Sequence, residues 1–150
     1  MSEEDRNNAL SRSFYEVLWS QGNLEAILEL VVKDFFDHHP LPGVPPRREG
    51  LTALVTTWRT AFLDMRETVK DLISEGDKVV GRFTMRGTHS GEFMGVQPTG
   101  RSVTMSGIDI VCVAGGKIAK FWYGEHLPEP IQQLGAVLNF GASRTSRIER

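Results

Sequence analysis

Several features are scarce in this 150-residue chain, and each scarcity excludes a class of protein. There is one cysteine, Cys112, so no disulfide can form within the chain, and a reducing, cytoplasmic compartment is expected. No apolar run approaches the roughly 18 to 20 residues that span a bilayer. The first five residues are Met-Ser-Glu-Glu-Asp and lack the basic and apolar parts of a secretion signal.

Excess charge is also scarce. The net charge is −2, which gives no electrostatic reason to expect nucleic acid, and the arginines near the C-terminus are expected to be solvated. With 40% hydrophobic and 24% charged residues, the composition is that of an ordinary globular protein. The length fits a single domain over residues 1–150, with a flexible tail from about residue 141.

The first part of the chain has the apolar spacing of helices. This spacing occurs in residues 10–18, 24–31 and 51–62, and Ser2 with Asp5 resembles a capping box ahead of the first. Four prolines between residues 40 and 46 predict a stiff, extended loop in place of a helix.

The second part has the pattern of strands. Gly115 and Gly116 are a strong hairpin signal between the last two of them. The predicted strands are residues 67–74, 78–85, 102–113 and 117–125, and a short helix follows from Pro128 to Leu134. Three helices followed by a twisted antiparallel meander predict an α+β fold. A curved sheet closed on one side by helices leaves a cone-shaped interior suited to a small molecule.

The order of several short motifs resembles that of a known family. These motifs are Asp37-His38, Asp64, Glu75–Val80, Gly87–Gly95, Pro98–Gly100, Gly116–Ile118, Trp122 and Gln132–Gly135. No single motif is specific, but the ordered set spans nearly the whole chain. The sequence is similar to the SnoaL-like polyketide cyclases, within the nuclear-transport-factor-two-like superfamily of cone-shaped α+β barrels.

The resemblance implies a barrel whose mouth holds the substrate, in a homodimer that pairs sheet faces. It also implies ring closure of a polyketide by intramolecular aldol condensation, without metal or cofactor. In the family, the acid/base residue is an aspartate four positions after the tryptophan near the end of the last strand. Here that position holds His126, preceded by Glu125. A side branch of the family is associated with cofactor-free hydroxylation of aromatic polyketides.

Two residues are the candidate catalytic groups. His126 titrates near neutrality, so it can abstract a proton flanked by two carbonyls, and the alternative is a histidine at the rim. Strict alternation places His126 on the same face as Trp122 if no bulge intervenes. Asp109 lies within an apolar strand and shares its face with Val103, Met105 and Val111. A buried carboxylate needs a partner, either His126 in a catalytic pair or backbone or Arg82 in a structural one.

Further residues are candidates for substrate binding. His38 and His89 match positions that often line the family pocket, although each can instead fix its own loop. Arg82 can polarise a substrate carbonyl or anchor a carboxylate, and its ordinary alternative is an ion pair with Asp71 or Glu92. Candidate walls for a flat aromatic ligand, which are also ordinary core residues at this spacing, are Trp58, Phe62, Phe93, Met94 and Trp122, and Glu125 completes the candidate binding set.

No cofactor or metal is expected. The four histidines lack the spacing of a zinc site, and no glycine-rich phosphate loop joins a strand to a helix. The sequence therefore predicts an enzyme that acts on a polyketide-derived or similar multi-carbonyl molecule, with an apolar or aromatic substrate as partner and no nucleic acid or membrane. Cyclisation, isomerisation and hydrolysis stay open. Alternatives are a cofactor-independent hydroxylase, a non-catalytic binder of a small ligand, and a dimeric module with a filled interior.

Overall fold

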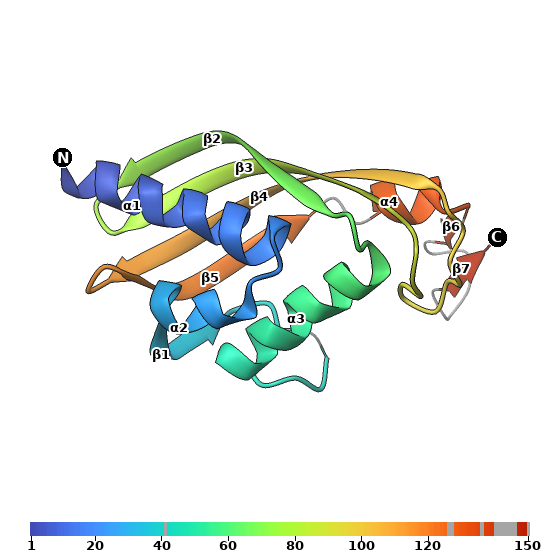
Figure 1. The fold of residues 1–150 in the computed structure, drawn as a ribbon, viewed down its shortest axis with the longest axis horizontal. Helices are drawn as coiled ribbons and strands as arrows, with labels where there is room; N and C mark the ends of the chain where they lie inside the picture. Colours follow the sequence, from blue (N-terminus) through green and yellow to red (C-terminus); the bar gives the residue numbers. More distant parts are fainter. Residues whose placement is uncertain (41, 126–127, 136, 140–146, 150) are drawn as a thin grey trace.

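A five-stranded sheet with helices on one face makes up the fold (Figure 1). The computed structural model describes residues 1–40, 42–125, 128–135, 137–139 and 147–149. The helices are α1 (Glu3–Ser13), α2 (Ile27–Leu30), α3 (Arg48–Ala61) and α4 (Pro128–Gln133), with a π-helical segment η1 (Phe14–Ser20) and a 3₁₀ turn η2 (Leu24–Ala26). The strands are β1 (Val31–Asp37), β2 (Arg66–Glu75), β3 (Lys78–Thr88), β4 (Ser102–Ala114), β5 (Lys117–Glu125), β6 (Val137–Asn139) and β7 (Arg147–Glu149).

The main sheet is mixed, in the order β1-β5-β4-β3-β2. Strands β2 to β5 form the expected antiparallel meander, but β1 pairs with β5 in parallel. The sequence analysis missed β1: it expected one helix through Val31 and assigned no element to residues 32–36. The short helices η2 and α2 form in the first part, and the run Val31–Asp37, rich in valine and phenylalanine, adopts the strand that such residues favour.

The first helix begins as predicted and ends differently. Ser2 Oγ accepts from the backbone N–H of Asp5 at 3.0 Å, and the Asp5 carboxylate accepts from the N–H of Ser2 at 3.1 Å, which confirms the capping box. From Phe14 the helix widens into η1, where the Gln21 N–H donates to the Glu16 carbonyl five residues back. The wider turn changes which side chains face the sheet.

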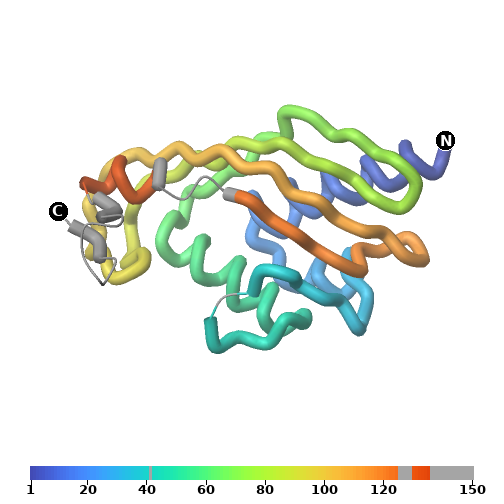
Figure 2. Tube along the Cα trace, turned by 180° about the vertical axis from the view of Figure 1, so that it is seen from behind, coloured from blue at the N-terminus to red at the C-terminus, as the bar shows by residue number. Residues whose placement is uncertain are grey.

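The hydrophobic core fills the space between the helices and the inner, concave face of the sheet. The helices α1 and α3 lie along this face (Figure 1), and apolar side chains of η1 and α3 belong to the core. Seen from behind, the outer face has no described helix over it (Figure 2). On β3 the inward residues are Val79, Phe83 and Met85, each at most 2% exposed.

A bulge in β5 changes the expected alternation of that strand. Val113 pairs with Ile118 and Cys112 with Lys120, so Ala119 is an extra residue between the two pairs. Ile118 and Phe121 are therefore buried, whereas Lys120 is exposed on the outer face. The predicted grouping of Ile118 with Lys120 and Trp122 on one face was wrong for this reason.

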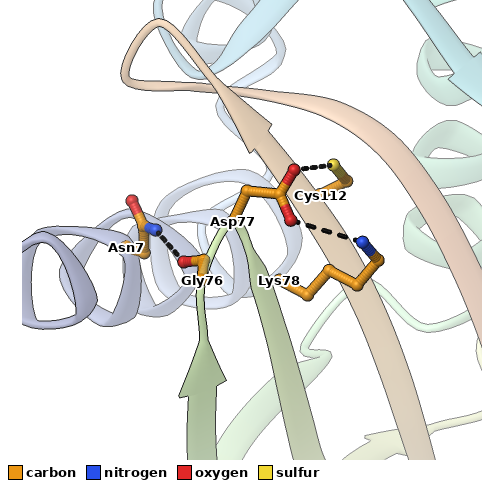
Figure 3. A network of polar contacts seen from close by, with 5 residues as sticks. All are labelled: Asn7, Gly76, Asp77, Lys78 and Cys112. Atoms are coloured by element: carbon orange, nitrogen blue, oxygen red, sulfur yellow. Dashed lines mark hydrogen bonds and ion pairs between the residues drawn. The ribbon is translucent and has the colours of Figure 1, made fainter.

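Two tight turns hold the ends of the hairpins. Gly115 and Gly116 have φ values of 58° and 77°, which confirms the two-residue hairpin turn between β4 and β5. At the turn between β2 and β3, Asn7 Nδ2 donates to the Gly76 carbonyl, and the Cys112 thiol donates to the Asp77 carboxylate at 3.4 Å (Figure 3). The thiol bond lowers the pKa of Asp77, with the nearby Lys78 ammonium adding to the effect. These contacts attach the turn to α1 and β4.

Candidate functional site

A buried carboxylate lies on the concave face, at Asp109 of β4. It alternates with Met105, Gly107 and Val111 as predicted, and it is 4% exposed. The Tyr15 hydroxyl, on η1 and also buried, donates to Asp109 Oδ2 at 3.1 Å. Moving a carboxylate out of water costs several kcal/mol unless hydrogen bonds replace those to the solvent. One hydrogen bond to a charged group offsets only part of this cost.

The position of Tyr15 depends on a glycine in the neighbouring strand. Gly81 of β3 pairs with Asp109, and a Cβ at Gly81 would lie 2.6 Å from the Tyr15 hydroxyl oxygen. Tyr15 also packs on Phe83, with ring centroids 5.4 Å apart. The sequence analysis missed Tyr15 as a site residue. A glycine inside a strand often marks a close approach of another group, so Gly81 was the available signal.

His89 provides a second buried polar group on the concave side. Its exposed fraction is 0%, and its Nδ1 accepts from the backbone N–H of Thr99 at 3.1 Å, with Thr99 Oγ1 at 3.0 Å. Because that N–H can only donate, the proton of the neutral ring is on Nε2. Within the described residues Nε2 has no hydrogen-bond partner. A buried donor without a partner costs about 1–3 kcal/mol, which a ligand acceptor would recover.

Three of the predicted aromatic wall residues form a group of ring contacts that reaches His89 through Phe62. The ring centroids of Phe62 and His89 are 5.7 Å apart, those of Trp58 and Phe93 4.7 Å, and those of Phe62 and Phe93 5.2 Å. These four residues, Trp58, Phe62, His89 and Phe93, are the aromatic cluster. All four are buried, and they come from α3 and from the loop between β3 and β4.

Asp109 and the aromatic cluster are separate along the sheet. Asp109 pairs with Gly81 of β3, and His89 is eight positions further along, directly after the end of that extended strand, or roughly 26 Å away at about 3.3 Å per residue. One aromatic ring cannot contact both groups. The apolar concave face therefore carries two separate buried polar groups, Asp109 along the strands and His89 beyond the end of β3.

Three other predicted binding residues lie on the outer face. His38 stacks on Trp122 with ring centroids 4.3 Å apart, and its N–H donates to the Phe121 carbonyl at 2.9 Å. Arg82 Nε donates to Asp71 at 2.7 Å in an exposed ion pair, the ordinary alternative considered for this residue. The structure thus places His38, Trp122 and Arg82 on the opposite side of the sheet from Asp109.

Two further predicted site residues, Met94 and Glu125, lie at the margins of the fold. Met94 is at the tip of a turn, with φ of 50° and a side chain 52% exposed. Glu125 is the last residue of β5 and pairs with Gly107. His126 lies outside the described residues, so its predicted pairing with Asp109 stays a prediction.

A further buried carboxylate lies at the end of β1. Asp37 is 2% exposed, and burial raises its pKa, partly offset by the backbone N–H of His39, which donates to it at 2.8 Å. His39 Nδ1 in turn accepts from the Tyr123 N–H, and the Tyr123 hydroxyl donates to the His39 carbonyl. These bonds fix the start of the proline loop against β5.

The described part of the chain offers little for a metal and shows hollows away from Asp109. It contains no group of three or more histidine, cysteine, aspartate or glutamate residues close enough to hold a metal ion.

One hollow lies between η2 and α3, one at the outer face of β2 to β4, and one between α1 and the β4–β5 turn. Neither Asp109 nor His89 lines any of these three.

Comparison of the sequence with protein families decides the relationship. The profile of the SnoaL-like polyketide cyclases matches residues 9–134, which is most of the chain and all of the main sheet. The chain belongs to the SnoaL-like polyketide cyclase family. No curated protein matches the chain, and no helix in the described ranges is long and apolar enough to cross a membrane.

Solved structures with the SnoaL-like fold agree with this assignment. IdmH from Streptomyces antibioticus, provisionally described as a polyketide cyclase, is 34% identical, with a TM-score of 0.76 over 86% of this chain and 98% of that one. A Bacillus cereus protein with the same provisional description is 30% identical, with a TM-score of 0.77 over 90% and 85%. AclR from Streptomyces galilaeus, provisionally described as a hydroxylase, is 26% identical, with a TM-score of 0.78 over 89% and 83%.

Proposed function

We propose that this SnoaL-like protein is an enzyme that rearranges a polyketide-derived or similar multi-carbonyl molecule by acid/base chemistry without a cofactor. The supporting observation is a buried carboxylate, Asp109, oriented by Tyr15 on an otherwise apolar face. An apolar environment around a few ionisable groups suits reaction of a carbon acid, because a low local dielectric strengthens their action on developing charge.

The proposed roles follow from the chemistry of each group. His126, at the position of the family's acid/base residue, takes a proton from a carbon between two carbonyls, and Asp109 is the second proton-transfer group. The enolate carbon attacks a second carbonyl of the same molecule, and the resulting alkoxide receives the proton. The product is an isomer of the substrate. The aromatic cluster holds the far end of the molecule, with His89 Nε2–H donating to a carbonyl there.

A test of this proposal compares product masses. The protein is incubated with aromatic polyketides that carry a β-keto ester side chain, and products are followed by liquid chromatography and mass spectrometry. We expect a new product of unchanged mass, formed at a rate about 10²-fold or more lower in Asp109→Asn and in His126→Ala. Asp71→Asn, which removes an outer-face carboxylate, is the matched control and should keep the rate. Full activity in both site variants would exclude the proposed roles.

The hydroxylase alternative is supported by the likeness to AclR. In the same assay it predicts a product heavier by one oxygen atom, together with oxygen consumption and no added flavin or metal. A non-catalytic binder predicts unchanged substrate and a saturable change in the fluorescence of Trp58. The three functions therefore give different results in one experiment.

We also propose that the protein is a homodimer in the cytoplasm, joined through the outer face of the sheet. Apolar side chains are exposed there in neighbouring strands: Ile73 is 65% exposed, Ile108 54%, and Ile110 and Phe36 36% each. A contiguous apolar patch of this kind on a sheet face is typical of an interaction surface. The compartment follows from the single cysteine.

A further inference from the structure

A polar hollow lies on the outer face, where β2 starts and β3 ends. Its volume is about 570 Å³, and its walls include two arginines and four hydroxyl side chains, Arg66, Thr68, Arg86, Thr88, Ser102 and Thr104. The member of the proposed dimer patch nearest to the hollow along β4 is Ile108, which lies four residues from Thr104, or about 13 Å at about 3.3 Å per residue. The hollow is therefore separate from that patch.

The two arginines of this hollow occupy directly opposite positions on adjacent strands, on the same face of the sheet. Arg66 of β2 pairs directly with Arg86 of β3, and like charges directly opposite each other destabilise a sheet. Among the described residues, neither guanidinium has an ion pair or a hydrogen bond. Arg82, on the same face of β3, does have a partner in Asp71 at 2.7 Å. The Arg66–Arg86 pair is thus a concentration of positive charge without compensation in the described chain.

The carboxylate at the rim of the hollow is held by other groups. Asp64 accepts from the backbone N–H of Thr88 at 2.7 Å and from Thr88 Oγ1 at 2.8 Å, one bond at each oxygen. These bonds to Thr88 lower the pKa of Asp64, and the guanidinium of Arg59 adds a smaller effect. Asp64 is therefore engaged with Thr88 and forms no ion pair with Arg66 or Arg86.

We propose that this hollow binds a small molecule through an oxyanion, a phosphate or a carboxylate, that bridges Arg66 and Arg86. Two guanidinium groups present paired N–H donors that match the oxygens of such an anion. Thr68 is two residues from Arg66 along β2, and Thr104 of β4 pairs with Arg86, so the hydroxyl groups of both threonines can donate to further oxygens. The site is independent of the concave face and of the proposed reaction.

The test is a titration of the full chain, followed by amide resonances in ¹⁵N NMR spectra. The probes are inorganic phosphate and succinate, each against sodium chloride at equal ionic strength. We expect saturable shifts at the amides of Arg66, Thr68, Arg86 and Thr104 with at least one probe. Arg66→Gln and Arg86→Gln should weaken binding about tenfold or more, because each removes one bidentate contact.

Arg82→Gln is the matched control, since it removes the same charge from the same strand and face. It should leave the affinity unchanged. Binding of only one probe identifies the oxyanion as phosphate or carboxylate. The proposal is overturned if neither probe gives saturable shifts, or if Arg82→Gln weakens binding as much as Arg86→Gln, since general charge attraction then explains the effect. It is also overturned if Arg66→Gln changes the sedimentation coefficient, because the arginines then contact a second copy.

Discussion

At the scale of single residues, sequence reasoning found the buried carboxylate and missed what holds it. The alternation of β4 was enough to place Asp109 among apolar side chains. Its partner Tyr15 lies 94 positions earlier in the chain, in a π-helical segment. The spacing rules of an α-helix do not predict which way a side chain points in such a segment. The protonated nitrogen of His89 likewise depends on Thr99, which the loop between β3 and β4 returns to it. Side chains brought together by long-range folding are not visible in local patterns.

The hydrogen bond from Tyr15 to Asp109 should contribute measurably to stability. Tyr15→Phe leaves the ring in place and removes one donor to a buried carboxylate, so we expect a loss of about 1.5–3 kcal/mol in the free energy of unfolding, measured with urea. Tyr123→Phe removes a hydroxyl whose acceptor is the carbonyl of the exposed residue His39, and should cost less than about 1 kcal/mol. Equal losses in the two variants would contradict a special role for the buried bond.

At the scale of elements, the sequence predicted the strands of the meander and the helix α3 but not β1 or the bulge in β5. The meander strands have alternating burial and strong turn signals, which are local properties. A strand that pairs in parallel with β5, as β1 does, has no adjacent turn to reveal it. Ala119 is one extra residue in β5, and side chains alternate between the two faces with a period of two. Lys120 and Trp122 therefore lie on the outer face and not on the predicted inner one.

Helix α4 covers the edge of β4 that β5 leaves open. Gln133 Oε1 accepts from the Thr104 N–H at 2.6 Å, and Gln133 Nε2 donates to the Thr104 carbonyl at 2.9 Å, like a short neighbouring strand. In Gln133→Ala we expect the Thr104 amide to exchange with deuterium about tenfold faster or more, since the loss of about 1.4 kcal/mol of local protection corresponds to that factor. Gln132→Ala, at the exposed neighbouring position, should not change it. Equal exchange in both variants would show that another group covers this edge.

The loop from α3 to β2 is tied to β3 by Asp64. Its pKa lies below the ordinary 3.8 because the N–H and hydroxyl of Thr88 donate to it. A lowered pKa in the folded state stabilises the fold above the unfolded value, and this stabilisation is lost as the pH falls through the folded value. The melting temperature of Asp64→Asn should therefore fall less than that of the wild type between about pH 5 and pH 2.

The control for this acid dependence is Asp34→Asn, which removes an exposed carboxylate of β1. This variant should follow the wild-type curve. The interpretation of Asp64 is wrong if its variant follows that curve too, or if its melting temperature falls more steeply in acid.

At the scale of the whole molecule, the ordered motifs predicted the family and its α+β architecture, and the family profile confirmed both. The chemistry could not be predicted to the same depth. Members of one fold support different reactions through a few side chains, and His126 stands where the resemblance to the family implies an aspartate. The outer face carries exposed isoleucines, and the proposed dimer would remove these apolar side chains from water.

Dimerisation through the outer face can be tested by placing a charge in its centre. Ile108 is 54% exposed there, and Ile108→Lys should convert a dimer to a monomer in sedimentation velocity, because a charge buried in an interface loses its hydration. Leu28→Lys adds the same charge at a 63% exposed leucine of α2, away from the sheet's outer face, and should leave the dimer intact. A wild-type protein that sediments as a monomer at all concentrations would contradict the dimer.

The central claim is that the concave face receives the small molecule. The most direct measurement is an NMR titration of the Asp109→Asn variant, which should bind without turnover, with an aromatic β-keto ester. We predict saturable shifts at the amides of Phe62, His89, Phe93 and Met105, and a shift of the His89 Nε2 resonance as its proton gains an acceptor. Shifts confined to outer-face residues such as Ile108 and Thr84, with His89 unchanged, would contradict the account.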